Sequence, residues 1–166
     1  PVLYNIEGHG EAALSSSFEE AIEKANIDIQ TLNLLSEGAV PDDADCILIN
    51  APTGDFSDDE KDAVIDYLEN GGKALIFSDY SAGDQENFKE ILRTYGVETV
   101  DGVIFEGDSQ HYLSQMPYYL IPEIRSTDIT SDISEKGTYV LVPVAQGIQT
   151  ICLLYTSPSP RDSTSS

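Results

Sequence analysis

The sequence predicts an α/β fold: a three-layer sandwich with a mostly parallel sheet, of the flavodoxin-like or Rossmann-like kind. Three observations lead to this prediction. Short apolar segments alternate with amphipathic segments over the first hundred or so residues. The segment at 46–50 is continuously apolar, which is typical of a central strand covered on both faces. Repeated β-α-β order requires right-handed crossovers, and these place helices on both faces of the sheet.

The strands and helices are expected in the following order. Strands are predicted at 2–6, 27–32, 46–50 and 74–78. The first helix spans about 14–25, with a capping box formed by Ser16 and Glu19 or by Ser17 and Glu20. The second begins after Ser57 and ends at 71–72, where two glycines follow each other. A third helix carries Phe88, Ile91, Leu92 and Tyr95 and ends at Gly96.

The second half of the chain is less regular. Short β-like segments are predicted at 97–100 and 103–105, and one more strand at 139–144. Residues 1–151 are expected to form a single α/β domain that is a fragment of a longer chain. Residues 152–166 shift abruptly to serine and proline, and we expect a non-native or disordered tail that resembles translated sequencing-adapter read-through. A natural Ser/Pro linker is the alternative.

The charge of the chain excludes several classes of partner. There are 30 Asp and Glu against 8 Lys and Arg, which gives a net charge of −22. Nucleic acids and anionic lipid head groups are recognised by clustered basic residues, so neither is an expected partner. No Cys/His cluster has zinc spacing, and we expect no metal and no cofactor. No apolar run is long enough to cross a membrane.

The candidate ligand-binding residues follow the predicted strands. Ligands of open α/β sheets bind at the carboxyl ends of the strands. The candidates at these ends are Gly8, His9, Gly10, Glu11, Pro52, Asp55 and Asp79. The two glycines permit a tight turn and a close approach to a ligand, but this is neither a dinucleotide fingerprint nor a P-loop. The alternative is a histidine that packs or hydrogen-bonds at a tight turn.

Two kinds of chemistry are conceivable at this edge of the sheet. His9, Glu11, Asp55 and Asp79 could together hold a divalent ion, although nothing in their spacing demands one. A hydrolytic nucleophile needs a Ser or Cys on a strand-to-helix elbow, where this chain has Ala51 and Pro52. We therefore expect a domain that is not an enzyme. The alternative is a hydrolase that uses His9 with Glu11 or Asp79 as its acid–base pair.

Several segments, in this order, carry a family resemblance. They are LYNIEGHGE, LNLLSEGAVPDDADCILINAP, FSDDEKDAVIDYLENGGKALIF, LRTYGVE and ISEKGTYVLVPVAQGIQ. Together they resemble the extracytoplasmic domain of the GldG family, the auxiliary proteins of gliding-motility-type and related uncharacterised ABC transporters. A relation to amidotransferase-like or sugar-binding modules remains open.

The resemblance implies a non-catalytic binding or interaction domain on the extracytoplasmic side of the cell membrane. Its partners would be the ABC permease and ATPase subunits of the same transporter, and its membrane anchor would lie in segments missing from this fragment. The family offers no catalytic set. The matched positions are expected to define the fold, with ligand contact left open: Gly8, His9, Gly10, Glu11, Pro41, Asp45, Pro52, Glu60, Tyr67, Gly71 and Gly72.

Overall fold

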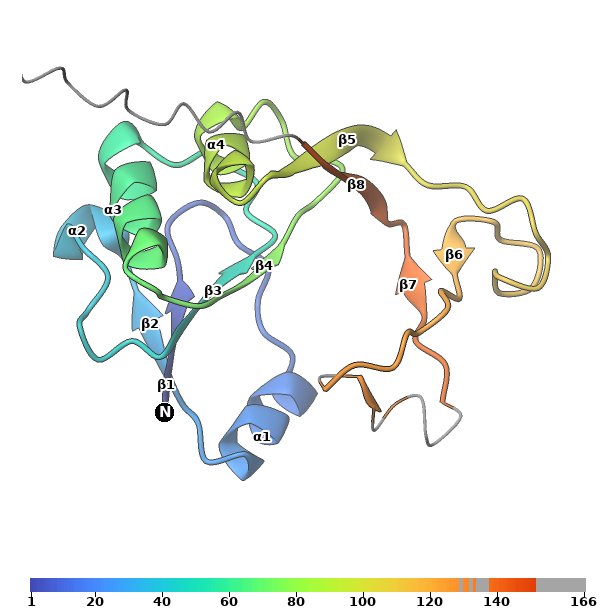
Figure 1. Ribbon diagram of the computed structural model, residues 1–166, viewed down its shortest axis with the longest axis horizontal. Coiled ribbons are helices and arrows are strands. Elements are labelled where there is room, and N and C mark those ends of the chain that lie inside the picture. Colours follow the sequence, from blue (N-terminus) through green and yellow to red (C-terminus); the bar gives the residue numbers. More distant parts are fainter. Residues whose placement is uncertain (129, 132, 134–137, 152–166) are drawn as a thin grey trace, which may run out of the picture.

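The computed structural model describes residues 1–128, 130, 131, 133 and 138–151. The predicted tail at 152–166 lies outside these residues. Four parallel strands form the central sheet: β1 (Val2–Ile6), β2 (Asp28–Leu32), β3 (Cys46–Asn50) and β4 (Ala74–Phe77). Their order is β2-β1-β3-β4 (Figure 1). The predicted α/β, flavodoxin-like fold is therefore confirmed.

The helices divide unequally between the two faces of the sheet (Figure 1). One face carries α2 (Leu34–Glu37), α3 (Asp58–Glu69) and α4 (Glu86–Thr94), and the other carries α1 (Ser16–Lys24). This division follows from right-handed crossovers, because the chain moves from β1 to β2 in one direction and from β3 to β4 in the other.

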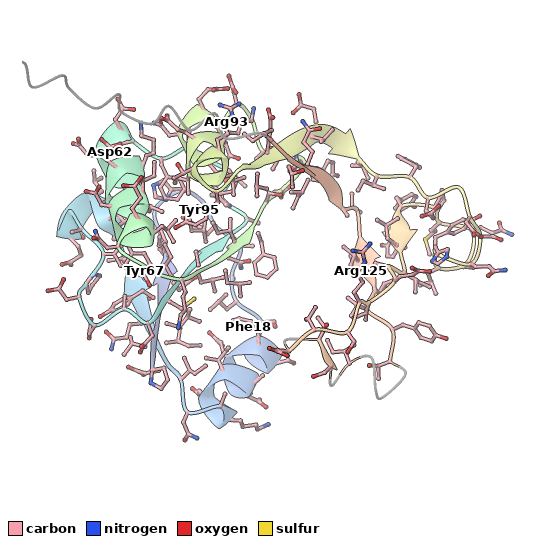
Figure 2. All side chains as sticks on the ribbon, in the orientation of Figure 1. Phe18, Asp62, Tyr67, Arg93, Tyr95 and Arg125 are labelled. Atoms are coloured by element: carbon pink, nitrogen blue, oxygen red, sulfur yellow. The ribbon has the colours of Figure 1, made fainter. Side chains whose placement is uncertain are left out.

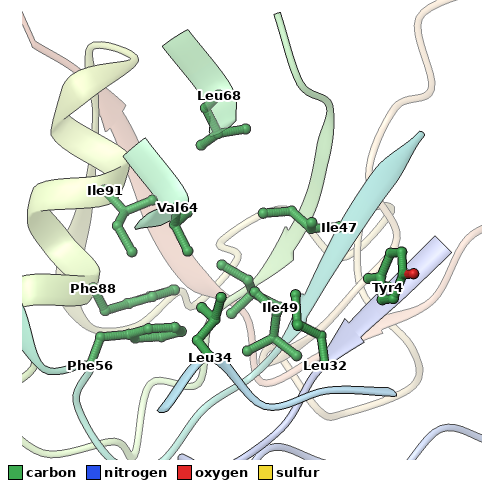
Figure 3. Packing of buried hydrophobic residues seen from close by; sticks show 11 residues of the cluster. Tyr4, Leu32, Leu34, Ile47, Ile49, Phe56, Val64, Leu68, Phe88 and Ile91 are labelled. Atoms are coloured by element: carbon green, nitrogen blue, oxygen red, sulfur yellow. The ribbon is translucent and has the colours of Figure 1, made fainter. Parts of the chain in front are cut away.

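The main core fills the space between the sheet and α3 and α4 (Figure 3). Alternate residues of β1 and β3 point into it, as the two-residue period of a strand requires. The buried apolar residues of this cluster are Tyr4, Ile6, Leu32, Leu34, Ile47, Ile49, Phe56, Val64, Leu68, Phe88 and Ile91. Burial on this scale is the main favourable term in the free energy of folding.

The opposite face is covered much less completely. Helix α1 has no buried residue, although Phe18 is half-buried on the side of the helix toward the sheet (Figure 2). Leu75 and Phe77 of β4 remain 39% and 46% exposed. Strand β4 is an edge of the sheet, and within the described residues no strand pairs with its outer side. The third layer of the sandwich is therefore thin.

The chain beyond α4 leaves the parallel sheet. Strand β5 (Val97–Val103) pairs antiparallel with β8 (Gln146–Thr150), and β6 (Tyr119–Leu120) pairs with β7 (Val142–Pro143). These two ribbons extend away from the sheet as an arm (Figure 1). In the described part of the chain, no helix is both long and apolar enough to cross a membrane.

Several local predictions were wrong. The α1 cap is Ser15, whose side chain accepts a hydrogen bond from the Phe18 N–H, rather than Ser16 or Ser17. The connection after β2 contains α2, which had not been predicted. One strand, β5, replaces the two expected segments at 97–100 and 103–105. The strand expected at 139–144 is reduced to β7, and β8 was missed.

Candidate functional site

The loop after β1 turns back on itself and buries His9. Gly8 and Gly10 have φ of 130° and 72°, values that favour glycine. A Cβ on Gly10 would also collide with the side chain of Thr53. The His9 carbonyl accepts hydrogen bonds from the N–H groups of Thr53 and Gly54, at 3.0 and 2.7 Å. The tight turn predicted from the two glycines is present, and it joins the loops after β1 and β3.

The imidazole of His9 lies between two carboxylates. Its Nδ1 is 2.8 Å from Glu11 Oε1, its Nε2 is 3.3 Å from Glu60 Oε1, and its side chain is 6% exposed. The ring stacks on Phe56 with the centroids 4.0 Å apart. We call His9, Glu11, Phe56 and Glu60 the His9 junction. Both ring nitrogens are engaged, as the alternative prediction of a hydrogen-bonded histidine at a tight turn requires.

Each carboxylate is itself held in place. Glu11 Oε2 accepts from the N–H groups of Gly8 and His9 at 3.1 and 2.8 Å. Glu60 is the third residue of α3, and its Oε2 accepts from the N–H and the hydroxyl of Ser57 in the predicted capping box. The His9 junction therefore connects the loop after β1 to the first turn of α3.

The contacts of the junction shift the pKa values of its three ionisable groups. The hydrogen bond to Glu11 raises the pKa of His9 and outweighs the opposing effect of burial, and Glu60 adds to the increase. Burial tends to raise the pKa values of Glu11 and Glu60, but their hydrogen bonds outweigh it and both values are lowered. The junction therefore favours an imidazolium between two carboxylates.

Asp55 and Pro52 bind the start of α4. The Asp55 carboxylate accepts from the N–H groups of Asn87 and Phe88, at 3.0 and 2.9 Å. The carbonyl of the buried Pro52 accepts from the Gln85 side chain at 2.9 Å. Asp55 was predicted to contact a ligand, and here both of its carboxylate oxygens hold backbone N–H groups of the protein.

Asp79 lies apart from these contacts. Its Oδ1 accepts from the N–H and the hydroxyl of Ser81, both at 2.7 Å, and these bonds lower its pKa. Of the seven predicted site residues, the structure joins Gly8, His9, Gly10 and Glu11 in one loop and places Pro52 and Asp55 in the loop packed against it. No hydrogen bond or ion pair within the described residues links Asp79 to either loop.

The elbow after β3 has the backbone conformation that presents a nucleophile in hydrolases, but its residue has no nucleophilic side chain. Ala51 has φ of 52°, in the left-handed region that most residues avoid. Strained strand-to-helix turns of this kind present the nucleophile in α/β-hydrolases. Here the position carries only a methyl group. Among the described residues, no group of three or more His, Cys, Asp or Glu could hold a metal ion.

Two contacts in this region were not predicted from the sequence, that of Glu60 with His9 and that of Gln85 with Pro52. Glu60 was assigned to the cap of α3 but not to His9, and Gln85 was not selected at all. No local pattern signals either contact, because each joins residues from different loops. The pairing of Glu60 with His9 follows only once the ends of β1 and β3 are placed side by side.

Comparison with known proteins matches the sequence to a family and the structure to a known fold. Residues 1–134 match a family described as ABC-type uncharacterized transport system. No curated protein matches the chain. A solved structure described as mmIFT52 N-terminal domain is similar with a TM-score of 0.63, over 91% of this chain and 69% of that one. The identity is 14%, so this likeness concerns the fold alone.

Proposed function

The chain belongs to the family described as ABC-type uncharacterized transport system, and from this premise we propose that it is a non-catalytic interaction domain. Family membership gives it an auxiliary role in ABC-type transport, in association with components of a transporter. The finer proposal is that the domain lies on the extracytoplasmic side of the cell membrane, as in GldG-type auxiliary proteins, and contacts the permease and ATPase subunits.

The observation that carries the non-catalytic proposal is the elbow at Ala51. The left-handed backbone that could present a nucleophile is formed, but the side chain there is a methyl group. Acyl transfer by an elbow residue needs a hydroxyl or a thiol to attack the substrate. The residue that precedes the elbow, Asn50, uses its side-chain N–H to bond the Ala12 carbonyl at 2.7 Å. The elbow thus supports the packing of the loops.

The contacts of His9 also support this proposal. A general base must be free to reach the proton that it abstracts. In the His9 junction the ring is buried, stacked on Phe56 and bonded to carboxylates at both nitrogens. Asp79, the other proposed partner of His9 in an acid–base pair, bonds Ser81 instead. These contacts favour a structural role for the loop.

The association with transporter subunits can be tested by co-purification. The native gene product would be tagged, extracted from membranes of its source cells in detergent, and examined by mass spectrometry. A matched protein that lacks residues 1–151 serves as the control. We expect permease and ATPase subunits with the complete protein and a clear loss of at least one with the control. Equal recovery from both would contradict a role of this domain in the association.

The side of the membrane can be tested with a membrane-impermeant maleimide on intact cells. The free thiol of Cys46 is half-buried and burial raises its pKa, so it would be removed together with Cys152 by alanine substitutions. A cysteine at the exposed position of Glu69 then supplies the target. Labelling in intact cells is expected. Labelling only after lysis would place the domain inside the cell.

A further inference from the structure

A cavity of about 740 Å³ lies beside α1, on the thinly covered face of the sheet. It is lined by the ends of β1 and β2, by the loop after β1 and by α1 itself. This volume is within the range of small-molecule sites, about 300 to 1,000 Å³. The cavity shares Glu11 with the His9 junction but is otherwise built from different residues.

Among the described residues, the charged side chains that line the cavity all have the same sign. Glu7, Glu11, Glu19 and Glu23 contribute four carboxyl groups, and no Lys, Arg or His in this part of the chain lines the cavity. The Glu11 carboxylate is already bonded to His9. Within the described residues, Glu7, Glu19 and Glu23 make no ion pair, so three negative charges around the cavity lack a positive partner. Such a site favours a cation.

Asn5 supplies a second, independent indication of a ligand. Its side chain lines the cavity from β1, and the residue is only 8% exposed. Its amide nitrogen donates to Glu7 Oε1 at 3.2 Å, but its Oδ1 is buried without a hydrogen-bond partner in the described structure. A buried carbonyl oxygen that lacks a donor destabilises the folded state. A ligand that carries N–H groups would satisfy it.

The rest of the lining narrows the class of cation. Ala12, Ala13, Leu14 and Ile29 add apolar surface to the lining. The described residues contain no cluster of three or more ligands that could hold a metal ion. A lining that combines carboxyl groups with apolar surface suits a ligand that combines ammonium groups with methylene segments. We propose that this cavity binds a linear polyamine, with an N–H group donating to Asn5 Oδ1.

The proposal is independent of where the domain lies and of its transporter partners, and it is tested by titration calorimetry on the 166-residue chain. Spermidine is the probe, at about 0.15 M NaCl so that general attraction to the acidic surface is screened. Magnesium chloride and the uncharged polyol sorbitol are run in parallel. We expect saturable binding of spermidine at one site, and neither magnesium nor sorbitol should compete at equal concentration.

Two variants locate the site. Glu19→Gln with Glu23→Gln removes two cavity charges on α1, and Asn5→Leu removes the unpartnered oxygen. Each is expected to weaken spermidine binding by about tenfold or more. The matched control is Asp59→Asn with Glu69→Gln, which removes two exposed charges from α3 on the opposite face. It should bind like the unmodified chain.

The possible results separate clearly. Asn5→Leu removes a buried oxygen that has no partner together with one hydrogen bond to Glu7, so the variant is expected to keep its fold, which circular dichroism verifies. If Asn5→Leu folds and binds spermidine as tightly as the unmodified chain, the assignment of Asn5 is wrong. Equal weakening by the α3 control would mean only general charge attraction. Absence of saturable binding, or equal binding of magnesium, would overturn the proposal.

Discussion

His9 shows how one side chain can hold a fold together through charge. Its ring is bonded to Glu11 and Glu60 at its two nitrogens, and its carbonyl receives two N–H groups from the loop after β3. The ring therefore connects two loops and the first turn of a helix. Breaking a buried pair by removing one partner is costly, because the remaining charge is left uncompensated.

The raised pKa of His9 predicts a loss of stability at alkaline pH. A histidine whose folded pKa exceeds the unfolded value of about 6.5 contributes its full stabilisation below that value and loses it as pH rises through the folded pKa. The lowered pKa values of Glu11 and Glu60 work in the opposite direction, and their contribution is lost as pH falls below about 4.5 through the folded values.

Urea unfolding between about pH 5 and pH 9 measures the alkaline limb. We expect the free energy of unfolding to fall as pH rises above about 6.5, and His9→Gln to remove most of that slope. His111→Gln is the matched control, because His111 is partly exposed on the arm. An unchanged slope in His9→Gln would show that the ring is not the titrating group.

The backbone of Ala51 gives a second prediction at the residue scale. Its φ of 52° costs an L-residue about 1 to 2 kcal/mol, whereas glycine adopts it freely. Part of the gain is offset by the greater freedom of glycine in the unfolded chain. We expect Ala51→Gly to raise the free energy of unfolding by about 0.5 to 1 kcal/mol.

Ala63→Gly, in the middle of α3, is the control for Ala51→Gly. At a helical position the same exchange should destabilise the protein by about 1 kcal/mol. Chemical denaturation of both variants gives the comparison. A loss of stability in Ala51→Gly would mean that the elbow is not strained as its backbone angle indicates.

At the scale of the element, α3 depends on its first turn. Ser57 Oγ caps the Glu60 N–H and donates to the Glu60 carboxylate, which in turn holds His9. Ser57→Ala is expected to lower the free energy of unfolding by about 1 to 2 kcal/mol, toward the upper end for a helix cap. Thermal and urea unfolding would measure the change.

The control for Ser57→Ala is Ser17→Ala. Ser17 was one of the two caps predicted for α1, but it lies inside that helix and is exposed. Its substitution should change stability by less than about 0.5 kcal/mol. If both substitutions cost the same, the Ser57 cap has no special role and the link from the cap to His9 contributes little.

Elements with a long apolar pattern were predictable from the sequence, whereas those determined by distant contacts were not. The four parallel strands are short segments rich in apolar residues, β3 and β4 as continuous runs, while α3 and α4 have apolar residues at helical spacing. The positions of all six were predicted to within a few residues. Helix α2 has only four residues, too few to show a helical period. Strand β8 is mostly exposed and polar, and it is defined by its pairing with β5.

The candidate site follows the same division. The loop from Gly8 to Glu11 was predicted because its glycines mark a turn directly in the sequence. The hydrogen bonds between α4 and the Asp55 carboxylate could not be predicted. The N–H groups that donate them belong to a helix that begins beyond β4. Likewise, the sequence does not indicate that the Asn5 Oδ1 is buried without a partner, because burial depends on contacts made in the folded chain.

For the whole molecule, the charge of −22 predicts that salt increases stability. The folded chain holds its carboxylates closer together than the unfolded chain, so their repulsion favours unfolding. Raising NaCl from about 0.01 M to about 0.1 M shortens the Debye length from about 30 Å to about 10 Å. We expect the urea midpoint to rise over this range.

Replacing NaCl with tetramethylammonium chloride at the same ionic strength is the control, because screening depends on ionic strength alone. Equal increases with both salts indicate screening. An increase with sodium only would indicate that sodium binds specific carboxylates. A midpoint that does not change with either salt would show that the acidic surface does not destabilise the fold.

The uncovered edge of β4 gives this charge a second consequence. Strand β4 pairs on one side only within the described structure, and its Leu75 and Phe77 are partly exposed. An open, apolar edge can pair with the same edge of another copy. Mutual repulsion between strongly acidic molecules opposes such encounters at low salt. Concentrated salt would therefore make each molecule harder to unfold while weakening the colloidal barrier that keeps copies apart in solution.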